Sequence, residues 1–229
     1  MGTAGVRRGT GVVAGALALL AVSACAARPG SSPEFDEVRK HVASPAETPS
    51  ATPAPAPPHN VFPVRAEAAS VHYGRVHHDY PATDVFAPCG SAVVAPAAGR
   101  IVEVSTADTW SSASNEGEDR GGLSWSLAGA DGVRYYGSHL ATLAPETRPG
   151  ATVAAGQVLG TVGRTGSARG TACHLHFGLS PICGPGDWWT RRGALTPYTY
   201  LRAWQRGTQR SPVAAVAAWR AKHGCPRTP

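Results

Sequence analysis

The chain has 229 residues and a net charge of +6. This mildly basic balance suits an anionic cell wall or membrane surface and gives little support to a nucleic-acid partner, because the N-terminal features indicate export. The part of the chain after residue 59 is long enough for one domain with a substantial core.

The first 24 residues have the order of features found in a secretory signal. Arg7 and Arg8 precede an apolar run over 11–22 that is too short for a comfortable transmembrane helix, and small residues then lead to Cys25. Small residues directly before a cysteine resemble a bacterial lipobox, which implies cleavage before Cys25 and a lipid on its sulfur. An ordinary signal peptide with an incidental cysteine is the alternative. We predict a lipoprotein signal peptide over 1–24 and an anchor on the outer face of the cytoplasmic membrane.

Residues 25–59 are rich in Ala, Pro, Ser and Thr. Such a segment cannot bury enough apolar surface to fold, and its prolines favour extended conformations. We therefore interpret 25–59 as the lipidated cysteine with its tether, 60–207 as the folded domain, and 208–229 as a C-terminal helical extension.

Most of the folded domain has the pattern of short strands separated by turns. The predicted strand segments are a hairpin over 91–105 around Gly99, a hairpin of 123–127 with 133–140, a tight pair over 153–162, and a strand over 171–179. Residues 106–122 are polar and are expected to form a long surface loop. Because strands and helices do not alternate, we expect an all-β core, an antiparallel sheet or small barrel.

Two helices are predicted near the C-terminus. Residues 198–206 are expected to form a short helix. The alanine-rich residues 213–222 follow Ser211, a candidate N-cap, and Pro212, a favoured first helical residue, while Gly224 can end the helix. Both helices are expected to pack over the sheet.

Four cysteines remain if Cys25 is lipidated, and an even number in an oxidising compartment suggests two disulfides with three alternative pairings. We favour Cys173–Cys183, which closes a short loop, and Cys89–Cys225, which fixes the C-terminus.

The segment 173–178, Cys-His-Leu-His-Phe-Gly, carries two histidines two residues apart. Alternate side chains of a strand share a face, so His174 and His176 are expected to point into a groove and Leu175 and Phe177 into the core. Imidazole is the commonest neutral metal ligand. Taken alone, the segment would also fit a half-buried strand whose histidines face water.

Two upstream segments add further candidate ligands. Residues 77–84 contain two histidines and two carboxylates, and His139 follows an aromatic strand-like run. Hydrolytic zinc sites use three protein ligands and keep a position for water. One imidazole and one carboxylate from 77–84, with one imidazole from the later segment, would complete such a set.

These motifs, in this order over 73–179, resemble the lysostaphin-type (LytM-like) zinc endopeptidases of bacterial cell walls. The resemblance extends to Asp84-Val85-Phe86-Ala87-Pro88, the run from Gly90 to Pro96, Gly150, and Gly156-Gln157-Val158-Leu159-Gly160. It implies a LytM-like fold, one Zn²⁺ bound by Asp84 and His176, and catalytic roles without metal binding for His139 and His174.

The resemblance leaves the first metal ligand open between His77 and His78. The family spacing would place a histidine at position 80, which is Tyr80 here, so the residues after Asp79 are expected to bulge out as an insert. The histidine that does not bind the metal, and Asp79, would support the site from outside. Tyr73 is a weak match to a family tyrosine near the scissile carbonyl.

The expected function is that of a monomeric zinc metalloendopeptidase hydrolysing amide bonds in peptidoglycan stem or cross-bridge peptides. One alternative is a catalytically idle LytM-like wall-binding domain that regulates another hydrolase. A second is a cysteine hydrolase built on Cys173, which the expected disulfide would disable. A carrier domain is excluded because no lysine lies between Lys40 and Lys222, so a hairpin tip has none to modify.

Overall fold

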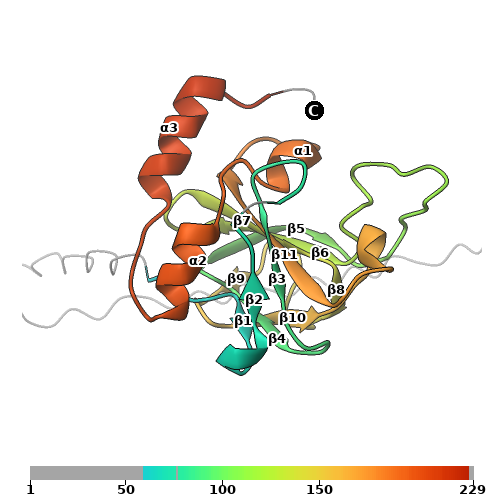
Figure 1. The fold of residues 1–229 in the computed structure, drawn as a ribbon. Helices are drawn as coiled ribbons and strands as arrows, with labels where there is room; N and C mark the ends of the chain where they lie inside the picture. Colours follow the sequence, from blue (N-terminus) through green and yellow to red (C-terminus); the bar gives the residue numbers. More distant parts are fainter. Residues whose placement is uncertain (1–58, 76, 227–229) are drawn as a thin grey trace, which may run out of the picture. The chain divides into compact units, whose positions relative to one another are not determined.

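The computed structural model describes residues 59–75 and 77–226 (Figure 1). The predicted signal peptide, Cys25 and all of the predicted tether except His59 lie outside the described residues. No helix in the described ranges combines the length and apolar content that a membrane crossing needs.

The larger of two sheets has seven strands in the order β2-β3-β11-β7-β6-β5-β9. Their bounds are β2 (His72–Tyr73), β3 (Thr83–Phe86), β5 (Gly99–Ser105), β6 (Ser124–Gly129), β7 (Val133–Ser138), β9 (Thr152–Val153) and β11 (His174–Pro181). Every neighbouring pair is antiparallel. The expected all-β antiparallel class is therefore confirmed.

The smaller sheet has four strands in the order β1-β4-β10-β8, again antiparallel throughout. These strands are β1 (Val64–Arg65), β4 (Ala92–Val94), β8 (Leu140–Leu143) and β10 (Val158–Val162). Apolar side chains from both sheets form one buried cluster, in which Val93 and Leu159 of the small sheet join Leu127, Leu175 and Phe177 of the large one. The last two are completely buried, as the alternation in β11 predicted.

The predicted hairpin across 130–132 is confirmed by the pairing of β6 with β7. The other two predicted pairs are wrong. β4 and β5 belong to different sheets, and β9 pairs with β5 while β10 pairs with β4 and β8. Gly99 marks a close approach of two strands and not a turn, since a Cβ there would collide with the carbonyl oxygen of Ala128.

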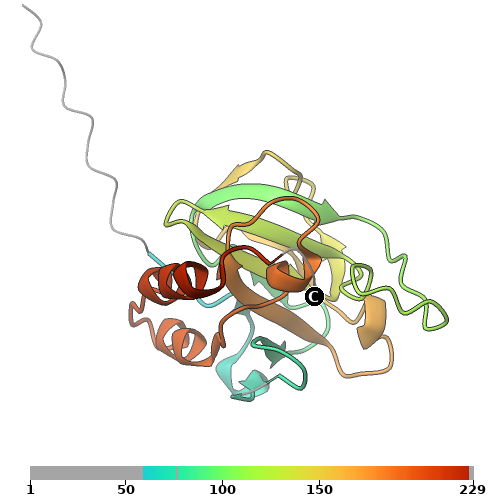
Figure 2. The same cartoon turned by 90° about the horizontal axis from the view of Figure 1, so that it is seen from above.

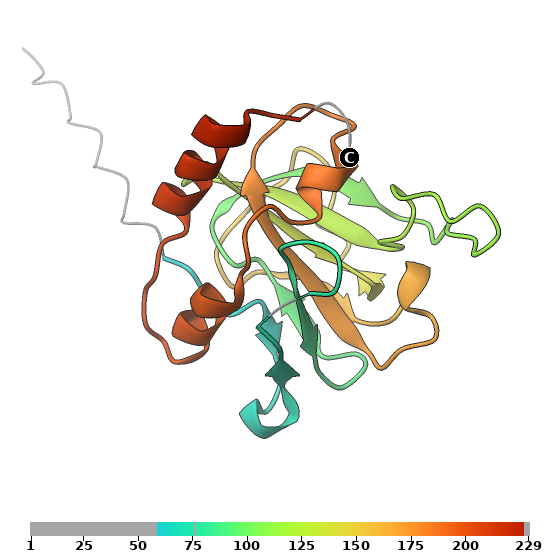
Figure 3. The same ribbon diagram turned by 45° about the horizontal axis from the view of Figure 1, so that its top comes forward.

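Three α-helices follow the sheets: α1 (Trp188–Arg191), α2 (Tyr198–Gln205) and α3 (Val213–His223). The last two confirm the predicted helices, and Leu201, Trp204 and Val216 bury their side chains in the core. Gly224 ends α3 with a positive φ of 68°, as expected. Figures 2 and 3 show α2 and α3 on one side of the domain and the loop before β6 on the opposite side.

All four remaining cysteines form disulfides, but the favoured pairing is wrong. Cys89 is bonded to Cys173, and Cys183 to Cys225. The reason is the sheet register: Phe86 on β3 lies opposite His174 on β11, so Cys89 and Cys173 emerge side by side from these paired strands. Cys183 follows the other end of β11 and meets the end of α3, which packs against that strand.

Two 3₁₀ turns complete the described elements, Ala68–Ser70 (η1) and Gly166–Ala168 (η2). The second follows Thr165, whose hydroxyl donates to the carbonyl of Leu140 at 2.8 Å. This bond ties the η2 turn to the start of β8, directly after His139.

Candidate metal centre

The register of three neighbouring strands brings the predicted site residues together. His176 on β11 lies opposite Asp84 on β3 and opposite Ser138 on β7. His174 is two residues before His176 and so shares its face. His139 directly follows β7, which places its ring beside the same strand.

Three potential ligand atoms converge at the centre of this face. One atom from each of His77, Asp84 and His176 lies within 4.8 Å of the others. His77 Nε2 is 3.8 Å from Asp84 Oδ2, and His176 Nδ1 is 2.9 Å from Asp84 Oδ1. Two imidazoles and a carboxylate are a common ligand set for zinc.

The hydrogen bonds of His176 favour a cation at this point. Its Nε2 lies 3.0 Å from the carbonyl oxygen of Arg192, which can only accept, so Nε2 carries the hydrogen in the neutral ring. Nδ1 then directs a lone pair at the carboxylate of Asp84. A lone pair facing an anion needs a proton or a metal ion between them, so the three residues fit a bound cation.

The structure places His77 and His78 differently. The side chain of His77 is 5% exposed and packs on the ring of His176, with 4.9 Å between ring centroids. The side chain of His78 is 72% exposed and its Nε2 lies 3.2 Å from the carboxylate of Asp79. Among these two histidines, only His77 joins the cluster of potential ligands.

We expect His77→Ala to weaken zinc binding at least about 100-fold, because loss of a partner outside the ligand set alone costs 10–100-fold. His78→Ala is the matched control and should bind zinc about as tightly as the unchanged protein. A competition titration with a chromogenic zinc chelator measures both. Zinc loss in His78→Ala with retention in His77→Ala would reverse the assignment.

Tyr80 does not turn away from the site, although an outward bulge was expected for the insert that follows Asp79. Its hydroxyl lies 3.4 Å from His176 Nε2, and its ring packs on His77 at 4.5 Å between centroids. Ala82 and Thr83 are buried. The residues inserted after Asp79 therefore place the ring of Tyr80 against the cluster of potential ligands.

His174 and His139 stand beside the cluster with defined ring orientations. His174 Nδ1 is 2.9 Å from the carbonyl of Ala172, and His139 Nδ1 is 2.8 Å from the carbonyl of Thr165. Both rings donate from Nδ1 and leave an Nε2 lone pair. His174 Nε2 lies 3.9 Å from Asp84 Oδ1, and the His139 and His174 ring centroids are 5.0 Å apart.

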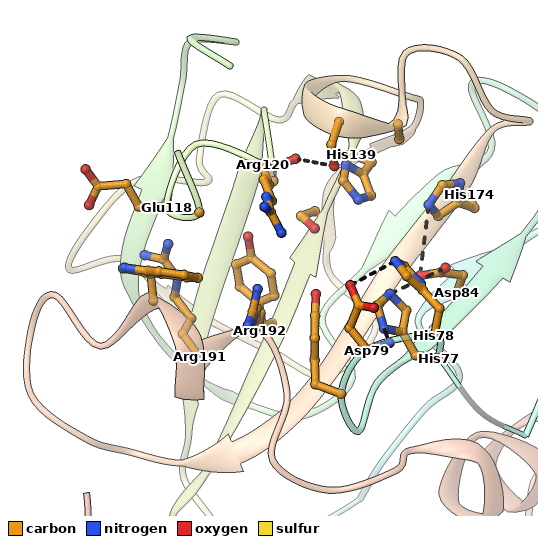
Figure 4. A pocket seen from close by; sticks show the side chains of 18 of the residues that line it. His77, His78, Asp79, Asp84, Glu118, Arg120, His139, His174, Arg191 and Arg192 are labelled. Atoms are coloured by element: carbon orange, nitrogen blue, oxygen red, sulfur yellow. Dashed lines mark hydrogen bonds and ion pairs between the residues drawn. The ribbon is translucent and has the colours of Figure 1, made fainter. Parts of the chain in front are cut away.

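His139 holds a backbone conformation that non-glycine residues seldom adopt, with φ at +65°. Its N–H donates to the carbonyl of Gly121 at 2.9 Å, and its ring bond to Thr165 fixes the other end. Non-glycine residues held with positive φ cluster at functional sites. The kink between β7 and β8 directs this imidazole into the pocket (Figure 4).

The electrostatics keep His77 and Asp84 in the protonation states that metal binding requires. Burial lowers the pKa of His77 to about 4 and that of His139 to about 3, with neighbouring His176 adding to both shifts. Burial alone would raise the pKa of Asp84, but the close approach of His176 and the other surrounding imidazoles hold it at about 2. Neutral imidazoles and an ionised carboxylate are the ligating forms.

A groove of about 390 Å³ is lined by His77, Asp84, His139 and His174. Its remaining walls include side chains that the sequence did not single out as functional: Tyr80, Arg120, Tyr136, Ser138, Arg191 and Arg192. Trp188 also lines the groove. The available signal was an aromatic pair at 188–189 followed by an arginine pair at 191–192, but nothing in this short segment indicates a groove.

Tyr73 is not part of the site. Its hydroxyl donates to Gln205 Oε1 at 2.8 Å, and its ring packs against Phe62 and Tyr198. Cys173 is bonded to Cys89, so its thiol is consumed and a cysteine hydrolase built on it is excluded. His77, Asp84, His139 and His174 line one groove, and His176 joins His77 and Asp84 in the cluster of potential ligands.

The chain is similar in sequence to known peptidases. The model of peptidase family M23 matches residues 78–185. The L-Ala–D-Glu endopeptidase of Bacillus subtilis is 32% identical over 138 residues, which are 58% of this chain and 36% of that protein. The chain therefore spans about a third of the length of this curated relative.

Two solved structures illustrate the range of similarity. The catalytic domain of the antimicrobial peptidase lysostaphin from Staphylococcus simulans is 28% identical, with a TM-score of 0.43, and the match covers 57% of this chain and 88% of that one. Csd3 from Helicobacter pylori is 20% identical, with a TM-score of 0.42, and the match covers 67% of this chain and 34% of that one.

Proposed function

We propose that this protein, whose residues 78–185 belong to peptidase family M23, is a zinc-dependent endopeptidase that hydrolyses amide bonds in peptidoglycan peptides. The observation that carries the proposal is the convergence of potential ligand atoms from His77, Asp84 and His176. His77 and Asp84 also line a groove together with two further imidazoles, those of His139 and His174. Three protein ligands in an open groove are the arrangement of catalytic zinc sites, which keep a position for water or substrate.

Zinc bound at this centre would supply Lewis-acid polarisation of the scissile carbonyl and would make water more acidic. His174 is placed to act as general base, because its Nε2 lone pair faces the groove one strand period from His176. His139 presents the same unprotonated atom from the other side, where it can accept a hydrogen bond from the attacking water. The proton that His174 takes from this water is then the one returned to the leaving amine.

The groove supports an active enzyme over a catalytically idle binding domain. A domain that only binds the wall needs no neutral imidazole aimed at the scissile bond. Here His139 and His174 are both held by backbone carbonyls in the tautomer that a base requires. His139 also keeps a positive φ to reach its position.

We also propose that the protein is exported, processed before Cys25 and anchored by a lipid to the outer face of the cytoplasmic membrane as a monomer. The proposed tether of about 30 residues could then extend up to ~90 Å at ~3.1 Å per residue if fully extended. This reach would let the folded domain, proposed to begin at residue 60, act on the inner layers of the wall.

Digestion of purified peptidoglycan by the zinc-loaded protein tests the function. We expect mass spectrometry to reveal new peptide fragments with free amines, and we expect a chelator to abolish them until zinc is restored. Because the proposed zinc supplies both the polarised carbonyl and the acidic water, we expect the two arms to differ by more than about 100-fold in rate.

The control arm uses protein carrying His174→Ala, which should release fragments at least about 100-fold more slowly although it is folded. Fragments that persist in chelator would contradict the zinc dependence. No fragments from any zinc-loaded preparation would contradict the proposed substrate.

A further inference from the structure

The groove continues beyond the metal centre into a half walled by arginines. Figure 4 shows Arg120, Arg191 and Arg192 together on the side opposite His77, Asp84 and His174. All of these residues line the same groove. A substrate peptide that occupies this half of the groove would therefore lie beside these guanidinium groups.

Arg192 lies nearest to the metal ligands. Its Cζ is 4.0 Å from the centroid of the Tyr80 ring and 4.9 Å from that of Trp188, so the guanidinium is held between two aromatic faces. Its backbone carbonyl accepts the hydrogen bond from His176. One residue thus orients a metal ligand through its main chain and carries a fixed cation beside it.

No carboxylate within residues 59–75 and 77–226 pairs with the guanidinium of Arg192. Its Nε is buried without a hydrogen-bond acceptor, as are those of Arg134 and Arg191. Arg192 differs from those two arginines because its charge has no carboxylate partner, and an anionic ligand can supply one.

Arg120 and Arg191 differ in how much of their charge remains available. Arg191 donates to Glu103 Oε2 at 2.6 Å and stacks on Tyr136, so its charge is largely neutralised. Arg120 donates from Nε to the neutral amide oxygen of Asn115 at 3.1 Å. Its charge is therefore not compensated by a carboxylate in the described part of the chain.

The nearby acidic groups do not cancel these two cations. Glu118 lies on the exposed loop before β6 and makes no ion pair with any described arginine. Asp79 is exposed and lies against His78, on the metal side of the groove. Arg120 and Arg192 thus remain as two fixed positive charges within one recess.

A buried ion pair holds the arginine-bearing helix in place. Arg134, 2% exposed, donates to Asp187 Oδ1 at 2.8 Å and to the carbonyl of Cys183 at 3.0 Å. The carbonyl of Asp187 in turn accepts the N–H groups of Thr190 and Arg191 at the start of α1. Helix α1 and Arg192 after it are therefore preorganised, which lowers the entropy lost when a ligand binds.

We propose that Arg120 and Arg192 form a carboxylate-binding subsite next to the metal centre, so that the substrate is a peptide with a free carboxylate close to the scissile amide. Planar guanidinium groups bind carboxylates through two parallel hydrogen bonds, and such charge-assisted pairs are strong. The inference rests on the proposed peptidase function and narrows its substrate to acidic stem peptides over neutral glycine bridges.

Three peptides test the subsite with zinc-loaded protein: one with an L-Ala–D-Glu bond, the same peptide with the D-Glu carboxyl amidated, and pentaglycine. We expect kcat/KM for the carboxylate peptide to exceed that for the amide about 10- to 100-fold, because hydrogen bonds to charged groups discriminate on this scale. Pentaglycine should be cleaved more slowly still.

Arg192→Gln and Arg120→Gln should each lower the ratio of carboxylate to amide cleavage toward 1, while zinc content and melting temperature stay unchanged. Arg148→Gln is the matched control, since Arg148 is exposed outside the groove, and it should keep the full ratio. If Arg192→Gln fails to fold because it loses its aromatic contacts, Arg120→Gln decides the question.

Equal cleavage of the carboxylate and amide peptides by the unchanged protein would overturn the subsite and leave the peptidase function intact. A ratio that survives in both arginine variants would also overturn it. Failure to cleave these peptides and purified peptidoglycan alike would instead contradict the proposed function itself, and the subsite with it.

Discussion

His176→Ala is expected to lose bound zinc and to lower kcat/KM at least about 10³-fold. His176 Nδ1 is the candidate ligand atom whose lone pair faces Asp84, and its ring contacts His77 as well. Losing the metal removes several kcal/mol of transition-state stabilisation, and each 1.36 kcal/mol is tenfold in rate. Zinc content by atomic absorption and peptidoglycan turnover measure the two effects.

Two further variants accompany His176→Ala: one at a second candidate ligand and one control outside the site. Asp84→Asn keeps the size of the side chain, removes the charge, and should also lose zinc. His223→Ala changes an exposed histidine on α3 and should keep both zinc and activity. If His176→Ala retained one zinc per chain and normal turnover, the metal centre would have to be elsewhere in the protein.

His174→Ala is expected to keep zinc and to lower kcat about 10²–10⁴-fold, the range that general acid–base groups contribute. His174 donates from Nδ1 to the carbonyl of Ala172 and so directs its Nε2 toward the groove beside the potential ligands. It does not belong to the cluster of His77, Asp84 and His176, so its loss should leave the zinc bound. Zinc stoichiometry and kcat on the same preparation test the prediction.

The double variant His139→Ala with His174→Ala sharpens the result. Residues that act on one proton transfer are strongly non-additive, so the double variant should lose little more than the worse single variant. Independent, multiplying losses would show that the two imidazoles do not act in one step. Unchanged kcat in His174→Ala would remove it from the catalytic machinery.

The local pattern of the sequence was sufficient for the catalytic strand. Alternation in Cys-His-Leu-His-Phe-Gly predicts which side chains of β11 enter the core, and Leu175 and Phe177 are buried as expected. The β6–β7 hairpin was predictable for the same reason, because its turn residues and its two strands are adjacent in the chain. In both cases the information lies within a few residues.

Features that depend on distant pairing were not predictable in this way. Gly99 lies between two strand-like runs, yet β4 and β5 join different sheets, and only the packing against Ala128 explains the glycine. The disulfide partner of Cys89 follows from the register of β3 on β11, which short-loop arguments cannot supply.

The choice between His77 and His78 also could not be made from the sequence and required the structure. Adjacent residues of an irregular segment point in directions that no periodicity fixes, and here His77 is turned inward by contacts with Tyr80 and His176. Arg192 was missed for a related reason. Its role depends on contacts with His176 and with Tyr80, and Tyr80 is far from it in sequence.

The disulfide between Cys89 and Cys173 affects how the domain tolerates proteolytic cleavage. It closes a covalent ring that contains most of the sheet strands, the exposed loop before β6, and His139. Exposed loops are where proteases cut. A single cut in that loop would leave the two pieces tied together, with Asp84 on one piece and His176 on the other still side by side.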